Sequence, residues 1–277
     1  MVKRVFLHDG SYELHKSYFA YQNLRSSSGI PTGAVYGTIK MLKALGEKWQ
    51  PDVEIFFTDY SRQSFRTNLY PEYKGNRAET DDELKQQFAL IEEFCKASNL
   101  LCCKKEGFEA DDLIGTYAKY YAELGYEVYI VSGDKDLLQL ISDNISVIYS
   151  SSKDGWVIYD AQKCKETLGV SPAQVIDLKA ICGDNADNYK GVPGIGPKTA
   201  VSLLNAYGSL DGIYEHVEEL KGKTKDKFIE NKEIAYLCQT LATINCSVPD
   251  IPIPEYSKLT FTADTEEFLN ALDIRHV

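Results

Sequence analysis

The sequence lacks the features that mark several common classes of protein. No apolar run approaches the roughly 20 residues that a membrane-spanning helix needs, so we expect no membrane association. The first residues lead directly into a strand pattern, so we expect no signal peptide. The seven cysteines include no Cys-x-x-Cys pair, which argues against a zinc site or a disulfide framework and favours reduced thiols in the cytoplasm.

Basic residues are outnumbered by acidic ones. The 277 residues include 30 Lys and Arg against 41 Asp and Glu, which gives a net charge of −11. A negative charge argues at first sight against a nucleic-acid partner. That argument weakens where the acids surround divalent ions, because a bound ion inverts the local sign of the charge.

Strand and helix patterns alternate over the first 170 residues. The predicted strands are 2–8, 52–58 and 127–131, followed by a hairpin of 144–149 and 156–159 around a turn at 153–155. The predicted helices are 32–45, stopped by Gly46, then 83–99 and 110–124. This alternation predicts an α/β fold with a mostly parallel central sheet flanked by helices.

The pattern becomes helical after residue 170. Helices are predicted at 172–181, at 198–207 and within 211–244, followed by a linker at 251–254 and a short helix at 265–272. We therefore divide the chain into an α/β domain (1–170), a helical module (171–248), and a linker with a terminal helix that packs back on the first domain (249–277).

Acidic residues gather at predicted loops and element ends. Asp9, Asp59 and Asp134 each follow a strand, where Asp9-Gly10 is read as an acidic loop, and parallel strands end at the same edge of a sheet. One such Asp would be an ordinary turn residue, whereas three favour a metal site. The full set of candidate ligands is Asp9, Asp59, Glu109, Asp111, Asp112, Asp134, Asp136, Asp184 and Asp187.

The chemistry of this set indicates the metal. Glu109, Asp111 and Asp112 could simply complement a helix dipole, but such a dense cluster repels itself more than the dipole requires. Ligands that are all oxygen suit Mg²⁺ or Mn²⁺, and the absence of His and Cys argues against zinc. A pair of such ions can activate a water and neutralise the leaving oxygen in phosphodiester cleavage.

A glycine-rich turn, Gly191-Val-Pro-Gly-Ile-Gly-Pro-Lys198, directly follows Asp184 and Asp187. It opens a predicted helix and would aim backbone N–H groups at phosphate. A bare Gly-x-Gly turn is more often a simple connection, but here it lies beside candidate metal ligands. The combination predicts an enzyme that acts on a nucleic-acid backbone.

Taken in order, these motifs resemble the structure-specific 5′-nucleases, which include phage 5′-exonucleases, flap endonucleases and the N-terminal nuclease domain of bacterial DNA polymerase I. The matching segments include Asp9-Gly10, Phe57-Thr-Asp59, Phe65-Arg66, Pro71–Arg77, Gly107–Gly115, Ser132–Asp136, Gly183–Asn188 and Gly191–Ala200. The resemblance implies a PIN-like nuclease domain with a helical arch near 70–100, and a helix-hairpin-helix (H3TH) DNA-binding module.

The resemblance also implies roles for residues. Asp9, Asp59, Glu109, Asp111 and Asp112 would form a first metal cluster, and Asp134, Asp136, Asp184 and Asp187 a second, holding two or more Mg²⁺ ions that Mn²⁺ can replace. Lys74 and Arg77 would hold the scissile phosphate, although an exposed turn with ordinary surface cations is the plainer interpretation. Arg66 would be a further phosphate contact, and Tyr73 would stack on a terminal base.

The DNA contacts implied at the hairpin are Gly194, Gly196, Lys198 and Thr199, with K⁺ at the turn carbonyls as an additional cofactor. Lys16 stands where the family commonly has Arg, which loses the bidentate phosphate geometry. His8, Ser61 and Gln63 also depart from the family pattern. The lysines at 221–227 either extend the basic surface or lie on a solvated loop.

The expected function is that of a Mg²⁺-dependent flap endonuclease and 5′→3′ exonuclease that removes primers and flaps. The expected partners are DNA with 5′ flaps, nicks or RNA primers, and a DNA polymerase; we expect a monomer in the cytoplasm. A PIN-like ribonuclease and a non-catalytic DNA-junction binder are the alternatives. The source stays open between a free-standing bacterial or phage enzyme and an excised polymerase domain.

Overall fold

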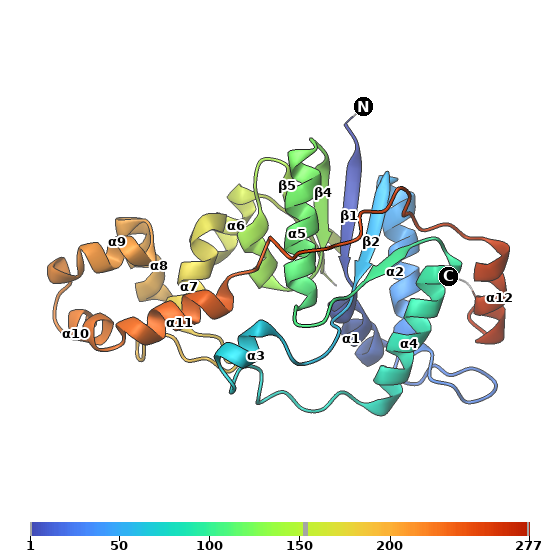
Figure 1. The fold of residues 1–277 in the computed structure, drawn as a ribbon, viewed down its shortest axis with the longest axis horizontal. Coiled ribbons are helices and arrows are strands. Elements are labelled where there is room, and N and C mark those ends of the chain that lie inside the picture. Colours follow the sequence, from blue (N-terminus) through green and yellow to red (C-terminus); the bar gives the residue numbers. More distant parts are fainter. Residues whose placement is uncertain (1, 152–154, 276) are drawn as a thin grey trace.

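The computed structural model describes residues 2–151, 155–275 and 277, and its centre is a six-stranded sheet (Figure 1). The strands run in the order β3-β2-β1-β4-β5-β6, and every neighbouring pair is parallel except β5–β6. Their bounds are Arg4–Asp9 (β1), Val53–Phe57 (β2), Leu101–Cys103 (β3), Glu127–Val131 (β4), Ile145–Ser151 (β5) and Gly155–Tyr159 (β6). The predicted mostly parallel α/β fold is confirmed.

Helices cover both faces of the sheet. Helices α1 (Gly10–Ala20), α2 (Gly33–Trp49) and α4 (Asp82–Ala97) pack on one face, and α5 (Ala110–Glu123) packs on the other. The alternation of side chains along β1 explains this, since Phe6 lies in the core of the first face while Val5 and Leu7 lie in that of the second. Both faces are buried, as is usual for a parallel sheet.

The helical module extends from the α5 side of the sheet, at the left of Figure 1. Short elements α3 (Phe65–Leu69), η1 (Lys135–Leu140) and α6 (Ala161–Leu168) lie between the sheet and this module. The module itself comprises η2 (Pro172–Gln174), α7 (Val175–Cys182), α8 (Pro197–Tyr207), α9 (Leu210–Glu215), η3 (Val217–Glu219), α10 (Lys223–Glu230) and α11 (Lys232–Ala242). One hydrophobic core runs from the α5 face into the module.

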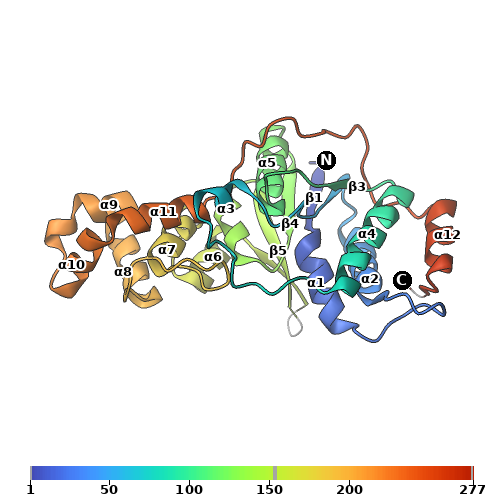
Figure 2. The same ribbon diagram turned by 60° about the horizontal axis from the view of Figure 1, so that its bottom comes forward.

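The C-terminal segment returns across the sheet to the opposite end of the molecule (Figure 2). The Ser257 hydroxyl contacts the Glu54 carbonyl on β2, and α12 (Ala263–Ala271) packs on α4, with the rings of Phe94 and Phe268 5.8 Å apart. None of the helices in the described ranges is long and apolar enough to cross a membrane.

Several local predictions need correction. The segment after Asp9 is helix α1 and not a loop, and it was missed because only Leu14 provides a buried apolar side chain. Helix α2 continues past Gly46 to Trp49, where Gln50 adopts the left-handed conformation instead. The predicted helix 172–181 is divided into η2 and α7. Residues 152–154, at the predicted hairpin turn, lie outside the described residues.

The region expected to form a helical arch is only partly helical. Residues 71–81 form turns and an extended segment, and α4 is the helix that follows them. Figure 2 shows this segment running from α3 beneath the sheet edge to α4.

Candidate active site

Carboxylates from separate strands meet at one edge of the sheet because β1 lies between β2 and β4 in a parallel arrangement. Asp9 is buried, and its Oδ2 accepts a hydrogen bond from the Ser132 hydroxyl at 2.6 Å. Asp59 Oδ1 accepts the backbone N–H of Ala110, at the start of α5, at 2.9 Å. These contacts tie the ends of β1, β2 and β4 and the first turn of α5 together.

The electrostatics place Asp9, Asp59, Asp111 and Asp134 in one group, called here the strand-end cluster. The pKa of Asp9 is raised to about 7, chiefly by burial and also by the charges of Asp134 and Asp59, while the hydrogen bonds from Ser132 and Tyr12 lower it. Burial, followed by the charges of Asp134 and Asp9, raises the pKa of Asp111 well above its ordinary value. Such mutual repulsion is what a divalent cation would relieve, so the donor set fits Mg²⁺ or Mn²⁺.

Asp134 was expected in the second cluster, but it is electrostatically close to Asp9 and Asp111 as well as to Asp136. It therefore lies between the two predicted clusters. This position follows from the end of β4, which is next to the end of β1.

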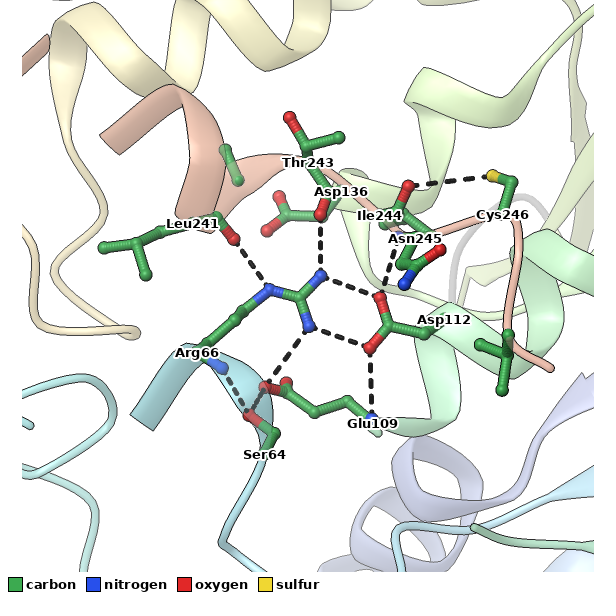
Figure 3. Close-up of polar contacts among 12 residues, drawn as sticks. Ser64, Arg66, Glu109, Asp112, Asp136, Leu241, Thr243, Ile244, Asn245 and Cys246 are labelled. Atoms are coloured by element: carbon green, nitrogen blue, oxygen red, sulfur yellow. Dashed lines mark hydrogen bonds and ion pairs between the residues drawn. The ribbon is translucent and has the colours of Figure 1, made fainter. Parts of the chain in front are cut away.

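Arg66 and Asp112 form an ion pair with each other, a contact that the sequence analysis did not predict. They form a bidentate pair with distances of 2.8 and 2.9 Å, and both side chains are almost completely buried (Figure 3). Arg66 also donates to the backbone carbonyls of Leu241 and Thr243. These contacts direct the N–H groups of Arg66 into the protein and give it a structural role, and a phosphate contact by Arg66 stays a prediction.

Asp112 also has a structural role within the protein, and its role as a metal ligand stays a prediction. Besides the two bonds from Arg66, its oxygens accept the backbone N–H groups of Glu109 at 3.1 Å and Asn245 at 2.8 Å. The side chain has no exposed surface. The pair joins α3 and α5 to the end of α11, and so fixes the helical module against the nuclease domain.

Glu109 lies beside this pair and faces the turn at 71–77. It accepts the Ser64 hydroxyl at 2.8 Å and forms an ion pair with the Lys74 ammonium. Burial opposes its ionisation, but Lys74 and Arg66 outweigh burial and hold the pKa of Glu109 below its ordinary value. Glu109 is therefore an ionised group that already has a cationic partner.

The same turn contacts the loop that follows α7. Arg77 Nη2 lies 2.6 Å from Asp187 Oδ1 and is half-exposed, so it can exchange its partner for a ligand. Tyr73 donates its hydroxyl to Asp187 Oδ2 at 3.0 Å, and its ring is only 5% exposed. Tyr73 is therefore enclosed in this structure, and its stacking on a terminal base stays a prediction.

Asp136 and Asp184 share Lys179 as an ion-pair partner, which the sequence analysis did not predict. The Lys179 ammonium lies 2.5 Å from both Asp136 Oδ1 and Asp184 Oδ2. The pKa of Asp136 is raised to about 6, chiefly by burial and then by the charge of Asp134, while Lys179 lowers it. Only the position of Lys179 in the last turn before Gly183 could have signalled this contact.

Within residues 2–151, 155–275 and 277, no three His, Cys, Asp or Glu side chains converge closely enough to enclose an ion as they stand. The repulsion between carboxylates explains the spacing at the strand-end cluster. Elsewhere the cations Lys74, Arg77 and Lys179 occupy oxygens that an ion would need.

The loop from Gly183 to Gly196 joins α7 to α8. Its first half folds back on itself so closely that a Cβ at Gly183 would lie 2.4 Å from the carbonyl carbon of Lys190. Gly196 precedes α8, whose first turn has no side-chain cap, and Lys198 and Thr199 are exposed there. Free N–H groups at a helix start suit an anion such as phosphate.

Two cations lie near the predicted DNA contacts. Lys227 on α10 donates to the Gly194 carbonyl at 2.7 Å. On α1, the Lys16 ammonium lies 3.7 Å from Glu13 Oε2, and its side chain is 37% exposed. Both can therefore approach a bound polyanion.

Two family models together match almost the whole chain. The 5′-3′ exonuclease N-terminal resolvase-like domain matches residues 4–169, and the 5′-3′ exonuclease C-terminal SAM fold matches residues 170–264. The chain belongs to the 5′-3′ exonuclease family.

Relatives and solved structures agree with this membership. The chain is 40% identical to DNA polymerase I of Streptococcus pneumoniae over 89% of its own length and 29% of the polymerase. It is 42% identical to the Rhizobium leguminosarum polymerase over 88% of this chain and 25% of that protein. The chain thus spans less than a third of the length of these relatives.

Among solved structures, T5 5′-exonuclease with bound zinc has a TM-score of 0.73 at 24% identity, over 88% of this chain and 90% of that one. T5 D15 flap endonuclease in a complex with DNA and metal ions also has a TM-score of 0.73, at 25% identity and the same coverage. These similarities support the same two-part fold.

Proposed function

We propose that this chain is a Mg²⁺-dependent, structure-specific 5′-nuclease that hydrolyses DNA at junctions between single-stranded and duplex segments. The observation that carries this proposal is the strand-end cluster, in which Asp9, Asp59, Asp111 and Asp134 crowd together at the carboxyl edge of the sheet. These carboxylates would hold Mg²⁺, or Mn²⁺ in its place, and the bound ions would supply activation of a water and neutralisation of the leaving oxygen.

The surrounding side chains bind and orient the phosphate. Lys74 and Arg77 are cations at the rim of the site. Each would exchange its carboxylate partner, Glu109 or Asp187, for phosphate oxygens. Fixed positive charge at this position offsets the charge that develops during hydrolysis. Asp136, Asp184 and Asp187 are the groups that would hold a second ion.

The helical module provides the grip on duplex DNA. The backbone of Gly194 and Gly196, together with Lys198 and Thr199, would contact phosphates without reading base sequence. K⁺ at the turn carbonyls would assist this contact. Lys16 on α1 would contact the backbone from the nuclease domain.

The proposed substrates are DNA with 5′ flaps, nicks or RNA primers, and the proposed role is the removal of primers and flaps in replication and repair. The similarity to DNA polymerase I supports a polymerase as the functional partner. We place the protein in the bacterial cytoplasm or nucleoid, or in a phage-infected host cell, acting as a monomer.

A panel of end-labelled substrates tests the proposal: flap DNA, nicked duplex and single-stranded RNA, each with Mg²⁺. We expect cleavage of the flap near the junction, leaving a 5′-phosphate. Preferential cleavage of the RNA would favour the ribonuclease alternative. Tight flap binding with no cleavage in Mg²⁺ or Mn²⁺ would favour a non-catalytic junction binder.

A further inference from the structure

Lys179 joins two carboxylates from different parts of the chain. It lies on α7, whereas Asp136 begins η1 after β4 and Asp184 begins the loop after α7. Its ammonium is 2.5 Å from one oxygen of each, so those two oxygens lie no more than twice that distance apart. A single ammonium therefore occupies the space between two oxygens that a divalent ion could bridge.

A second side chain shows that this space suits a ligand. The hydroxyl of Tyr189 is buried and has no hydrogen-bond partner among the described residues. Tyr189 is paired with Asp184 through two backbone hydrogen bonds of 2.8 and 3.0 Å, so it belongs to the same loop as that carboxylate. Water carried by a bound cation would provide the missing partner.

We infer that Lys179 is an exchangeable counter-cation, which neutralises Asp136 and Asp184 in the metal-free protein and competes with a divalent ion for their oxygens. This inference rests on the proposed function, which supplies the ion. The lysine side chain is flexible and 28% exposed, so it can withdraw when an ion binds. Arg66 cannot withdraw from its carboxylate partner in this way, because four separate hydrogen bonds fix its guanidinium.

The competition has a measurable consequence in the absence of DNA. Mn²⁺ binding to the full chain can be measured by electron paramagnetic resonance and calorimetry. We expect Lys179→Met to bind its second ion about tenfold more tightly than the wild type, because the competing ammonium has been removed. The increase in Tm on adding Mn²⁺ should also be larger in the variant, because the two carboxylates are then left without a partner until the ion binds.

Three further variants make the test specific. Lys179→Arg keeps the charge and should retain weak binding of the second ion. Lys85→Met removes an exposed lysine paired with Asp82 and should change neither measurement. Lys179→Gln is a second neutral variant in case the methionine variant does not fold.

An unchanged or weaker second Mn²⁺ affinity in folded Lys179→Met and Lys179→Gln would overturn the inference. If the wild type still cleaved flap DNA, the proposed function would stand and only the role of Lys179 would be wrong. Failure of the wild type to bind Mn²⁺ at all would overturn both.

Discussion

Asp9 illustrates how a single residue combines structural and chemical roles. It ends β1, caps α1 by accepting the Tyr12 N–H at 3.0 Å, and accepts the Ser132 hydroxyl with its other oxygen. Burial and its acidic neighbours keep its pKa near 7, so a proton or a metal ion is needed to neutralise it. The same carboxylate therefore orders the start of α1 and contributes charge to the site.

This pKa predicts how metal binding depends on pH. The folded-state pKa of Asp9, about 7, lies above the value of 3.8 for a free Asp side chain, so the folded protein holds a proton that the unfolded chain releases. The stability from this proton is complete below about pH 4 and is lost as the pH rises through 7. Divalent ions must displace the proton, so their affinity should rise from pH 5.5 to pH 8.

Calorimetry of Mn²⁺ binding in buffers with different ionisation enthalpies measures the proton release. Near pH 6 we expect protons to be released as the ion binds. Binding without proton release at that pH would show that Asp9 is already ionised in the folded protein.

Arg66 gives a second prediction at this scale. Arg66→Met leaves Asp112 buried without its partner, and removing one member of a buried ion pair typically costs about 3–5 kcal/mol. We expect a loss of this size in the free energy of unfolding, measured by urea denaturation. An exposed cation provides the control: Lys198→Met should leave stability near that of the wild type. Unchanged stability combined with weaker DNA binding in Arg66→Met would favour the phosphate-contact role.

At the scale of elements, the loop after α7 is the most constrained segment near the site. Asp184 and Tyr189 exchange two backbone hydrogen bonds of 2.8 and 3.0 Å, which closes the loop tightly. Gly183 has φ 73° and ψ 178°, a conformation that is essentially restricted to glycine. The loop geometry sets the positions of Asp184 and Asp187.

Gly183→Ala should therefore destabilise the fold by about 3 kcal/mol or more, since backbone strain and a steric clash act together. Gly208→Ala is the matched control, because Gly208 also has a positive φ but no atom lies within 4 Å of the added Cβ. Backbone strain alone, of about 1–3 kcal/mol, acts at Gly208. Thermal unfolding compares the two, and equal losses would contradict the account of the loop.

Comparison of the elements shows what the sequence could predict. The acids at the ends of β1, β2 and β4 were predictable because a parallel sheet brings those ends together. Helix α1 was not, because it lacks an apolar stripe. The pairing of Arg66 with Asp112 spans 46 residues of sequence, and neither residue type nor spacing indicates it. The contacts of Lys179 with Asp136 and Asp184 were not predictable for the same reason.

At the scale of the whole molecule, the two modules share a core and so form one body. Tyr117 on α5 and Phe228 on α10 belong to the same hydrophobic cluster, and the Arg66–Asp112 pair closes the junction. A rigid junction fixes the distance between the hairpin turn and the strand-end cluster. This geometry would determine where along a bound DNA strand cleavage occurs.

The net charge of −11 is compatible with DNA binding because the acids are unevenly placed. Several of them crowd the strand-end cluster, where divalent ions would offset them, while exposed Lys198 lies at the start of α8. Binding without divalent ions should therefore be weak, and it should strengthen when they are added.

The most direct test of the central claim is the rate of flap-DNA cleavage under single-turnover conditions, measured with Mg²⁺ for the wild type and for Asp134→Asn. Loss of a ligand between the two clusters should reduce the rate by about a hundredfold or more, because each metal ion contributes several kcal/mol to transition-state stabilisation. Flap binding in Ca²⁺ and the melting temperature of the variant show whether DNA affinity and folding are retained. A wild-type rate in Asp134→Asn, or cleavage that persists in excess chelator, would contradict the account.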